Sequence, residues 1–198
     1  FTRAGAMRVA DYPEHNVLQV DMDTRQVGVL AHEPRMNQPN DLAIDSQDRL
    51  YASDPNWSAG TGQLWRVDPD GTIDTFAGNG QDGLSGDGGP ATAAALSNPV
   101  DVGVGPDGQV YLVDKGNARS RVVDADGTIQ TFAGSTRGYA GDGGPAADAQ
   151  FRQPAGLGVG PDGSVYVADT ENSVIRRIDP SGIISTVAGS GDYGVSGD

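Results

Sequence analysis

One pattern recurs along this chain of 198 residues, and any fold must first explain its repetition. Three segments align: Pro39 begins PNDLAIDSQDRLYASD, Pro99 begins PVDVGVGPDGQVYLVD and Pro154 begins PAGLGVGPDGSVYVAD. Each is followed by a second shared segment, which reads LWRVDPDGTIDTFAG, SRVVDADGTIQTFAG and IRRIDPSGIISTVAG in turn. The starts lie 60 and 55 residues apart. Self-similarity at a nearly fixed period indicates an array of structural repeats.

Each repeat is expected to form four short strands joined by tight turns. In the repeat that begins at Pro99, the expected strands cover 101–104, 109–113, 121–124 and 129–132, and one helical turn is expected at 90–96. Between the strands stand Gly-Pro-Asp-Gly and Ala-Asp-Gly-Thr, in which Pro presets φ and Gly accepts a positive φ. A repeated four-stranded sheet predicts an all-β protein with a β-propeller fold, and a β-helix or an open stack of sheets is the less favoured alternative.

The repeats divide a single propeller domain, residues 1–198, into blades. Full blades are predicted at 39–98, 99–153 and 154–198, and 7–38 supplies the outer three strands of another, which makes about 3.75 blades. The family resemblance described below implies six blades in a complete ring. We therefore expect an incomplete domain: part of a longer gene product, or a subunit completed by self-association with a second copy.

The shared position after each repeat's first Pro predicts that 42–45, 102–104 and 156–159 are equivalent inner strands along one axis. Apolar residues on the first two strands of each blade should be mostly buried between blades, because a blade cannot cover its own two faces. The predicted core comprises Leu42, Ile44, Leu50, Val102, Val104, Val110, Leu112, Leu157, Val159, Val165 and Val167.

The composition narrows the range of partners. The net charge is −14, from 27 acidic and 13 basic residues, and such a field repels nucleic acid and anionic membranes, so neither is expected as a partner. No apolar run approaches the ~18–20 residues of a membrane span. Cysteine is absent, which excludes disulfides and thiolate metal sites. The compartment stays unknown, with a secreted or periplasmic location as the working hypothesis.

Residues from about 72 to 198 resemble NHL repeats. The resemblance rests on GDGGPA at Gly86 and Gly141, on the strands that follow Pro99 and Pro154, and on the closing Phe-Ala-Gly or Val-Ala-Gly. The family resemblance implies a propeller used as a binding scaffold. We expect such a scaffold here, with a protein, glycan or small molecule as the ligand and no cofactor.

The first 75 or so residues are similar to the gluconolactonase/senescence-marker-protein family, through HNVLQVDMDTRQVGVLAHEPRMNQPNDLAIDSQDRLYASDPNW. This resemblance implies an alternative function: a lactone hydrolase with a divalent metal, calcium or zinc, in the central channel. Asn40 and Asp41 match the family's Pro-Asn-Asp motif, so both are candidate channel residues and Asn40 is the candidate metal ligand. The next repeats carry Val100 and Ala155 at the position of Asn40, and no Glu-Gly pair supplies the family's Glu ligand. Whether the protein is an enzyme therefore stays open, and no catalytic residue is assigned.

Other acidic spacings favour structural roles. Asp68-Pro-Asp70-Gly71 and the matching segment at Asp124 lack the Glu that completes a calcium loop, so hairpin turns are expected. Asp87 and Asp142 lie in the GDGGPA loops. Because no Lys or Arg stands beside both copies, we expect a loop that packs between blades rather than an anion site.

A few further side chains are candidates for surface roles. Trp57 and Trp65 fall in the irregular segment DPNWSAGTGQLW, and Trp57 is the candidate loop anchor for a ligand or protein, with a cover over the blade edge as the alternative. The two histidines, His15 and His32, are expected in loops or at strand edges. The recurring third-strand arginines are expected to be solvated on the surface near carboxylates, with a partner-binding face as the alternative; these are Arg119, Arg121, Arg176 and Arg177.

Overall fold

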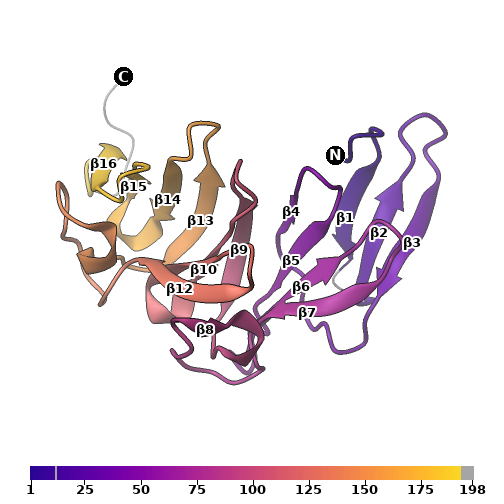
Figure 1. The fold of residues 1–198 in the computed structure, drawn as a ribbon, viewed down its shortest axis with the longest axis horizontal. Coiled ribbons are helices and arrows are strands. Elements are labelled where there is room, and N and C mark those ends of the chain that lie inside the picture. The colour runs from indigo at the N-terminus through magenta and orange to yellow at the C-terminus, as the bar shows by residue number, and fades with distance from the viewer. Residues whose placement is uncertain (12, 193–198) are drawn as a thin grey trace.

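The computed structural model describes residues 1–11 and 13–192, and these form four antiparallel β-sheets that follow one another in chain order across the molecule (Figure 1). The first sheet has the order β1-β2-β3, the second β4-β5-β6-β7, the third β8-β12-β11-β10-β9 and the fourth β13-β14-β15-β16. The strands are β1 (Met7–Asp11), β2 (Asn16–Val20), β3 (Val27–His32), β4 (Leu42–Ile44), β5 (Leu50–Asp54), β6 (Gln63–Val67), β7 (Ile73–Ala77), β8 (Gly89–Pro90), β9 (Pro99–Val104), β10 (Val110–Asp114), β11 (Arg119–Val123), β12 (Thr128–Ala133), β13 (Pro154–Val159), β14 (Val165–Asp169), β15 (Val174–Ile178) and β16 (Ile184–Ala188).

The strands expected from the sequence are confirmed to within two residues in the repeat that begins at Pro99. The helical turn expected at 90–96 is the 3₁₀ helix η1 (Ala91–Ala93), and short 3₁₀ turns also form η2 (Lys115–Asn117), η3 (Ala146–Asp148) and η4 (Thr170–Asn172). Strands β5 and β10 are buried along their whole length. A strand covered on both faces reads as a nearly continuous apolar run, which is why these segments lack a clear alternation.

The Asp-x-Asp-Gly segments form the expected hairpin turns. The Asp68 carbonyl accepts a hydrogen bond from the Gly71 N–H at 2.9 Å, and the Asp68 N–H donates one to the Thr72 carbonyl at 2.8 Å. Gly71 has φ +88°, and a Cβ there would lie 2.5 Å from the Leu30 carbonyl of the neighbouring sheet. Glycine is thus required both by the turn and by the close approach of two sheets. The same turn recurs at Asp124, whose carbonyl accepts the Gly127 N–H at 2.9 Å.

The first strands of the three later sheets, β4, β9 and β13, lie at one edge of their sheets and contact one another in chain order. This arrangement confirms the prediction that they are equivalent inner strands.

Two ends of each blade can then be distinguished. The loop end carries the starts of the inner strands and loop 55–62 with η2 and η4. The turn end carries the short turns that join the inner strand to the second strand, at 45–49, 105–109 and 160–164.

The hydrophobic core lies between successive sheets in three clusters. Six of the eleven predicted core residues are buried: Leu50, Val102, Val110, Leu112, Val165 and Val167. The other five are only half-buried but pack against the clusters: Leu42, Ile44, Val104, Leu157 and Val159. All five lie on inner strands, which have a neighbouring strand on one side only and so keep part of their surface open.

Each of the two GDGGPA segments belongs to a strap, which is our name for residues 78–98 and 134–153. A strap leaves the outer strand of one sheet and crosses the outer strand of the next. In the first strap, β8 pairs with β12, and in the second, Pro145 forms a bridge with Ile183 beside β16. This finding confirms the expectation that the Gly-rich loops pack between blades.

Candidate functional site

At the loop end, Asn40 and Asp41 join one inner strand to the next. Asn40 is exposed, and its Nδ2 donates a hydrogen bond to the Val100 carbonyl at 2.7 Å. The Asp41 Oδ2 accepts the Val102 N–H at 3.3 Å. Both side chains therefore contact the following blade, rather than capping the start of their own strand.

Asp101 repeats this contact one blade later. Its Oδ2 accepts the Leu157 N–H at 2.5 Å. Burial, together with a hydrogen bond and the charge of Asp41, raises the pKa of Asp101 to about 8. Asp101 is thus mostly protonated at neutral pH. Sequence reasoning missed Asp101, although it holds the same repeat position as Asp41 and Gly156, and the alignment of the repeats could have found it.

The inner-strand residues do not fit the divalent-metal site that the lactonase resemblance implies. A hard cation needs several oxygen ligands around one point. Both oxygens of Asp101 accept backbone N–H groups, from Val102 and Leu157. The positions equivalent to Asn40 are Val100 and Ala155, which offer no side-chain oxygen. Within residues 1–11 and 13–192, no group of three His, Asp or Glu side chains could hold a metal ion.

Trp57 lies on the same loop end, and 47% of its surface is exposed. The backbone N–H of Trp57 donates a hydrogen bond to the Gln38 Oε1 at 2.7 Å, and the Lys115 Nζ lies 5.6 Å from the centroid of the Trp57 ring. The loop carrying this indole is thereby attached to two blades. Trp65, which the sequence placed in the same irregular segment, instead lies buried within β6 and donates its Nε1–H to Asp54 at 3.1 Å.

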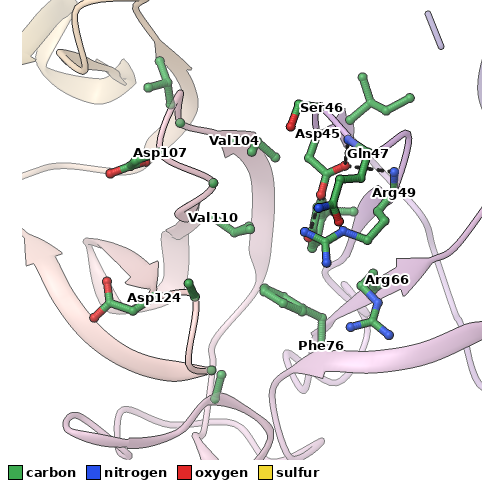
Figure 2. Close-up of a pocket in the computed structure, with 18 of the residues that line it drawn as sticks. Asp45, Ser46, Gln47, Arg49, Arg66, Phe76, Val104, Asp107, Val110 and Asp124 are labelled. Atoms are coloured by element: carbon green, nitrogen blue, oxygen red, sulfur yellow. Dashed lines mark hydrogen bonds and ion pairs between the residues drawn. The ribbon is translucent and has the colours of Figure 1, made fainter. Parts of the chain in front are cut away.

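A cavity of about 1110 Å³ opens at the turn end, between the sheet of β4–β7 and the sheet of β9–β12 (Figure 2). Arg49, Arg66 and Phe76 line one wall, and Val104 and Val110 point into it from the other. Sequence analysis did not indicate this site, because its two walls come from different repeats.

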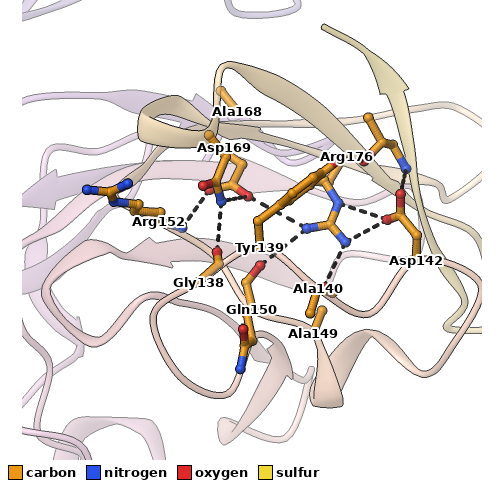
Figure 3. A network of polar contacts seen from close by, with 12 residues as sticks. Gly138, Tyr139, Ala140, Asp142, Ala149, Gln150, Arg152, Ala168, Asp169 and Arg176 are labelled. Atoms are coloured by element: carbon orange, nitrogen blue, oxygen red, sulfur yellow. Dashed lines mark hydrogen bonds and ion pairs between the residues drawn. The ribbon is translucent and has the colours of Figure 1, made fainter. Parts of the chain in front are cut away.

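A buried arginine forms the centre of a polar network at the outer side of the fourth sheet (Figure 3). Arg176 has no exposed side-chain surface, and its Nη2 lies 2.6 Å from the Asp142 Oδ1 and its Nη1 3.6 Å from the Asp169 Oδ2. The guanidinium also donates to the carbonyls of Ala140 and Gln150 at 3.1 and 3.2 Å. The network therefore joins β15 to the strap.

The third sheet repeats this network. Arg121, also without exposed side-chain surface, pairs with the strap residue Asp87 and has its Nη1 3.5 Å from Asp114. The expectation that these third-strand arginines are solvated is therefore wrong for Arg121 and Arg176. The signal lay in the spacing, since Asp87 precedes Arg121 by 34 residues and Asp142 precedes Arg176 by the same 34.

Burial changes the ionisation of the aspartates that end the second strands. It raises the pKa of Asp114 to about 6, although Asn117, the Ser97 N–H and Arg121 all favour the charged form. Burial likewise raises the pKa of Asp169, against the same kinds of partner. These carboxylates are thus engaged in holding the fold together.

The two histidines lie at a loop and a strand end as expected, since His15 lies between β1 and β2 and His32 ends β3.

The four successive sheets and their shared inner edge define a β-propeller. A model of the teneurin NHL domain family matches residues 68–140 and 136–197, so the chain belongs to this family. Teneurin-1 of Gallus gallus is 30% identical over 169 residues, which cover 75% of this chain and 6% of that protein. Protein SUPPRESSOR OF QUENCHING 1, chloroplastic, of Arabidopsis thaliana is 39% identical over 85 residues, or 42% of this chain and 8% of that protein. The chain thus spans less than a tenth of these relatives.

Solved structures share the fold at low sequence identity. An auxiliary nutrient binding protein of Bacteroides thetaiotaomicron has a TM-score of 0.72 at 17% identity, with 93% of this chain and 46% of that chain covered. A putative gluconolactonase has a TM-score of 0.66 at 14% identity, with 96% and 62% covered. At such identities the likeness concerns the propeller alone. In the described part of the chain, no helix is long and apolar enough to cross a membrane.

Proposed function

We propose that this chain is a section of a binding propeller, and that it contacts a protein or glycan partner at the loop end through Trp57. The observation that carries the proposal is a half-exposed indole on a loop held in place from two blades. Tryptophan is among the residues that most often dominate binding energy at interfaces. A loop that is already ordered loses little conformational freedom on binding, which favours affinity.

The binding role is favoured over lactone hydrolysis by the way the polar groups are used. Asn40 donates its amide to Val100, and Asp101 accepts two backbone N–H groups. Few oxygens are left for a catalytic metal. Calorimetric titration with calcium and zinc tests the alternative: micromolar binding that Asn40→Ala abolishes would favour the hydrolase.

The main experiment is a screen of glycan and peptide arrays with the whole chain and three variants. Trp57→Ala should lower the signal of every specifically bound probe at least tenfold, and Trp57→Phe should retain part of it. Tyr166→Ala is the matched control, because Tyr166 is an aromatic residue with 37% of its surface exposed elsewhere on the molecule. Melting curves should be unchanged in all three variants. Specific binding that survives Trp57→Ala undiminished would overturn the proposal.

A further inference from the structure

The cavity at the turn end has one polar wall and one apolar wall. On the polar wall, Arg49 and Arg66 stand beside Tyr51 and Phe76, whose rings meet edge to face with centroids 4.8 Å apart. The opposite wall includes Val104, Val110 and the backbone of the turns at 105–108 and 124–127 (Figure 2). Residues 90–92 of the first strap and 159–161 of the fourth sheet also line the cavity. A cavity of this size is large enough for a small organic molecule, whose sites typically measure about 300–1,000 Å³.

The two arginines keep hydrogen-bond donors that the fold does not use. Arg49 donates its Nε to Asp45 at 2.6 Å, and Arg66 donates its Nη2 to Asp68 at 3.2 Å. Within residues 1–11 and 13–192, neither Nη of Arg49 nor the Nη1 of Arg66 has a hydrogen-bond acceptor. About a third of each side chain is exposed, 35% and 33%. These donors can therefore reach a bound ligand.

The carboxylates around the cavity are engaged or directed elsewhere. Asp107 and Asp124 point away from it (Figure 2), and Asp124 accepts hydrogen bonds from Gln109 and Gln130. Asp126 accepts the N–H of residue 128 within its own turn. Asp74 lies on the rim with 67% of its side chain exposed, 4.0 Å from Arg66. Asp45 also lines the cavity but is paired with the Nε of Arg49, so the unused guanidinium donors remain available at this wall.

The next pair of sheets follows the same plan but carries different side chains at the positions of the two arginines. It keeps the aromatic pair, since Tyr111 and Phe132 meet edge to face at 4.9 Å. Gln109 holds the repeat position of Arg49, and Val122 holds that of Arg66. Val122 is 8% exposed and packs in the core. Arg49 and Arg66 thus stand where the next sheet has side chains that do not carry charge.

We propose that this cavity binds a small organic anion with a flat apolar body. Arg49 and Arg66 hold the anionic group, because guanidinium forms charge-assisted hydrogen bonds with carboxylates and related anions. The body packs against Phe76 and Val104, the apolar side chains of the two walls that are only partly buried. The site lies at the opposite end of the blades from Trp57 and does not depend on the role proposed for that residue.

The test compares 2-naphthoate with its neutral analogue 2-naphthylmethanol, both titrated into the ¹⁵N-labelled chain and followed by NMR. Naphthoate should bind at least tenfold more tightly than the alcohol and shift the turn amides of Gly105, Gly108 and Gly127. The double variant Arg49→Gln/Arg66→Gln should remove that preference. Arg177→Gln should keep it, because Arg177 holds the position of Arg66 on the fourth sheet, with 33% of its side chain exposed.

A second variant keeps the test decisive if the double variant unfolds. Arg66→Val copies the residue found at the equivalent position of the next sheet and should weaken naphthoate binding at least fivefold. Three results would each overturn the proposal: equal affinity for the acid and the alcohol, no binding of naphthoate at millimolar concentration, or shifts that avoid the three turn glycines.

Discussion

The two junctions between the last three sheets are built on one plan but carry different side chains. The cavity junction joins the sheet of β4–β7 to that of β9–β12, and the closed junction joins the latter to the sheet of β13–β16. Both contain a Tyr–Phe pair and a strap. At the cavity junction, Arg66 holds the position that Val122 holds at the closed junction, and a cavity opens between the two sheets. The repeat thus preserves backbone and aromatic contacts, while the side chains at the positions of Arg49 and Arg66 differ between the two junctions.

A second difference concerns the third strand. Trp65, Arg121 and Arg176 occupy equivalent positions and are all fully buried. Each faces the aspartate that ends its second strand, and Trp65 donates to Asp54 through Nε1. The carboxylate is therefore the constant element, and the donor beside it varies between an indole and a guanidinium. The two arginines also pair with a strap aspartate: Arg121 with Asp87 and Arg176 with Asp142.

The largest effect is expected from Arg176→Leu. This change leaves Asp169, which has no exposed surface, without its cationic partner. Removing one member of a buried ion pair typically destabilises by about 3–5 kcal/mol. Arg176→Trp should cost clearly less, because an indole N–H can replace one donor, as Trp65 does beside Asp54. Urea unfolding of both variants measures the difference.

Trp65→Phe is the control for the indole donor. Asp54 keeps the N–H groups of Asn37 and Gln38, so the loss should be only about 1 kcal/mol. If Arg176→Trp proves as unstable as Arg176→Leu, the two donors are not interchangeable and the comparison of the third strands fails.

A reciprocal exchange tests the junctions themselves. Val122→Arg inserts a charge into the filled core of the closed junction and should destabilise by roughly 2–4 kcal/mol. Arg66→Val removes a part-exposed, loosely paired side chain and should change stability by less than about 1 kcal/mol. Thermal melts of the two variants check the asymmetry. Equal losses would mean that the cavity junction is packed as tightly as the closed one.

Much of the fold could be predicted from the sequence, because period and turn chemistry are local signals. The four-stranded repeat, the Asp68 and Asp124 turns and the inner strands all follow from short segments. The burial of apolar side chains on the inner strands was overestimated. The period of the sequence does not reveal that a strand such as β4 has a neighbouring strand on one side only. Long-range pairing was missed for a similar reason: Arg176 appears as a surface charge until its partner, 34 residues earlier, is known.

The candidate sites could be predicted only in part. The position of Trp57 in an irregular loop left exposure and a cover over the blade edge as alternatives, and in the structure the side chain is half exposed. Asn40 and Asp41 were singled out by a motif, but their contacts with the next blade depend on how sheets stack. The cavity needed Arg49 and Val104 from different repeats, and no spacing in the sequence brings those two together.

A smaller effect, dependent on pH, is expected at the inner edge. The folded pKa of Asp101 is about 8, whereas an unfolded Asp titrates near 3.9. The folded state therefore binds the proton more tightly, and this contribution to stability is complete below pH ~4 and lost as pH rises toward 8. Asp101→Asn, which resembles the protonated acid, should flatten the fall in melting temperature between pH 5 and 8. An unchanged slope would show that Asp101 does not hold a proton in the folded chain over this pH range.

The smallest effects concern the strap aspartates, and they distinguish two copies of one network. Asp142 accepts two contacts from Arg176, at 2.6 and 3.1 Å, and the Thr186 N–H at 3.0 Å. Asp87 accepts from Arg121 and from the Thr131 hydroxyl, with no backbone N–H among the described residues. Both carboxylates are about half exposed, so each pair is partly screened. Asp142→Asn should cost about 1 kcal/mol, and Asp87→Asn less.

The pH dependence of Asp142 supplies a second measurement for that comparison. Burial opposes its ionisation, but hydrogen bonds from Thr186 and Arg176 outweigh burial and lower the pKa of Asp142. Its contribution is therefore present above the unfolded pKa near 3.9 and is lost as pH falls through the folded pKa. The difference in unfolding free energy between the wild type and Asp142→Asn should shrink steadily as pH falls below the unfolded pKa. A difference that stays constant as pH falls would mean that packing of the strap, and not the charge of Asp142, holds it against β15 and β16.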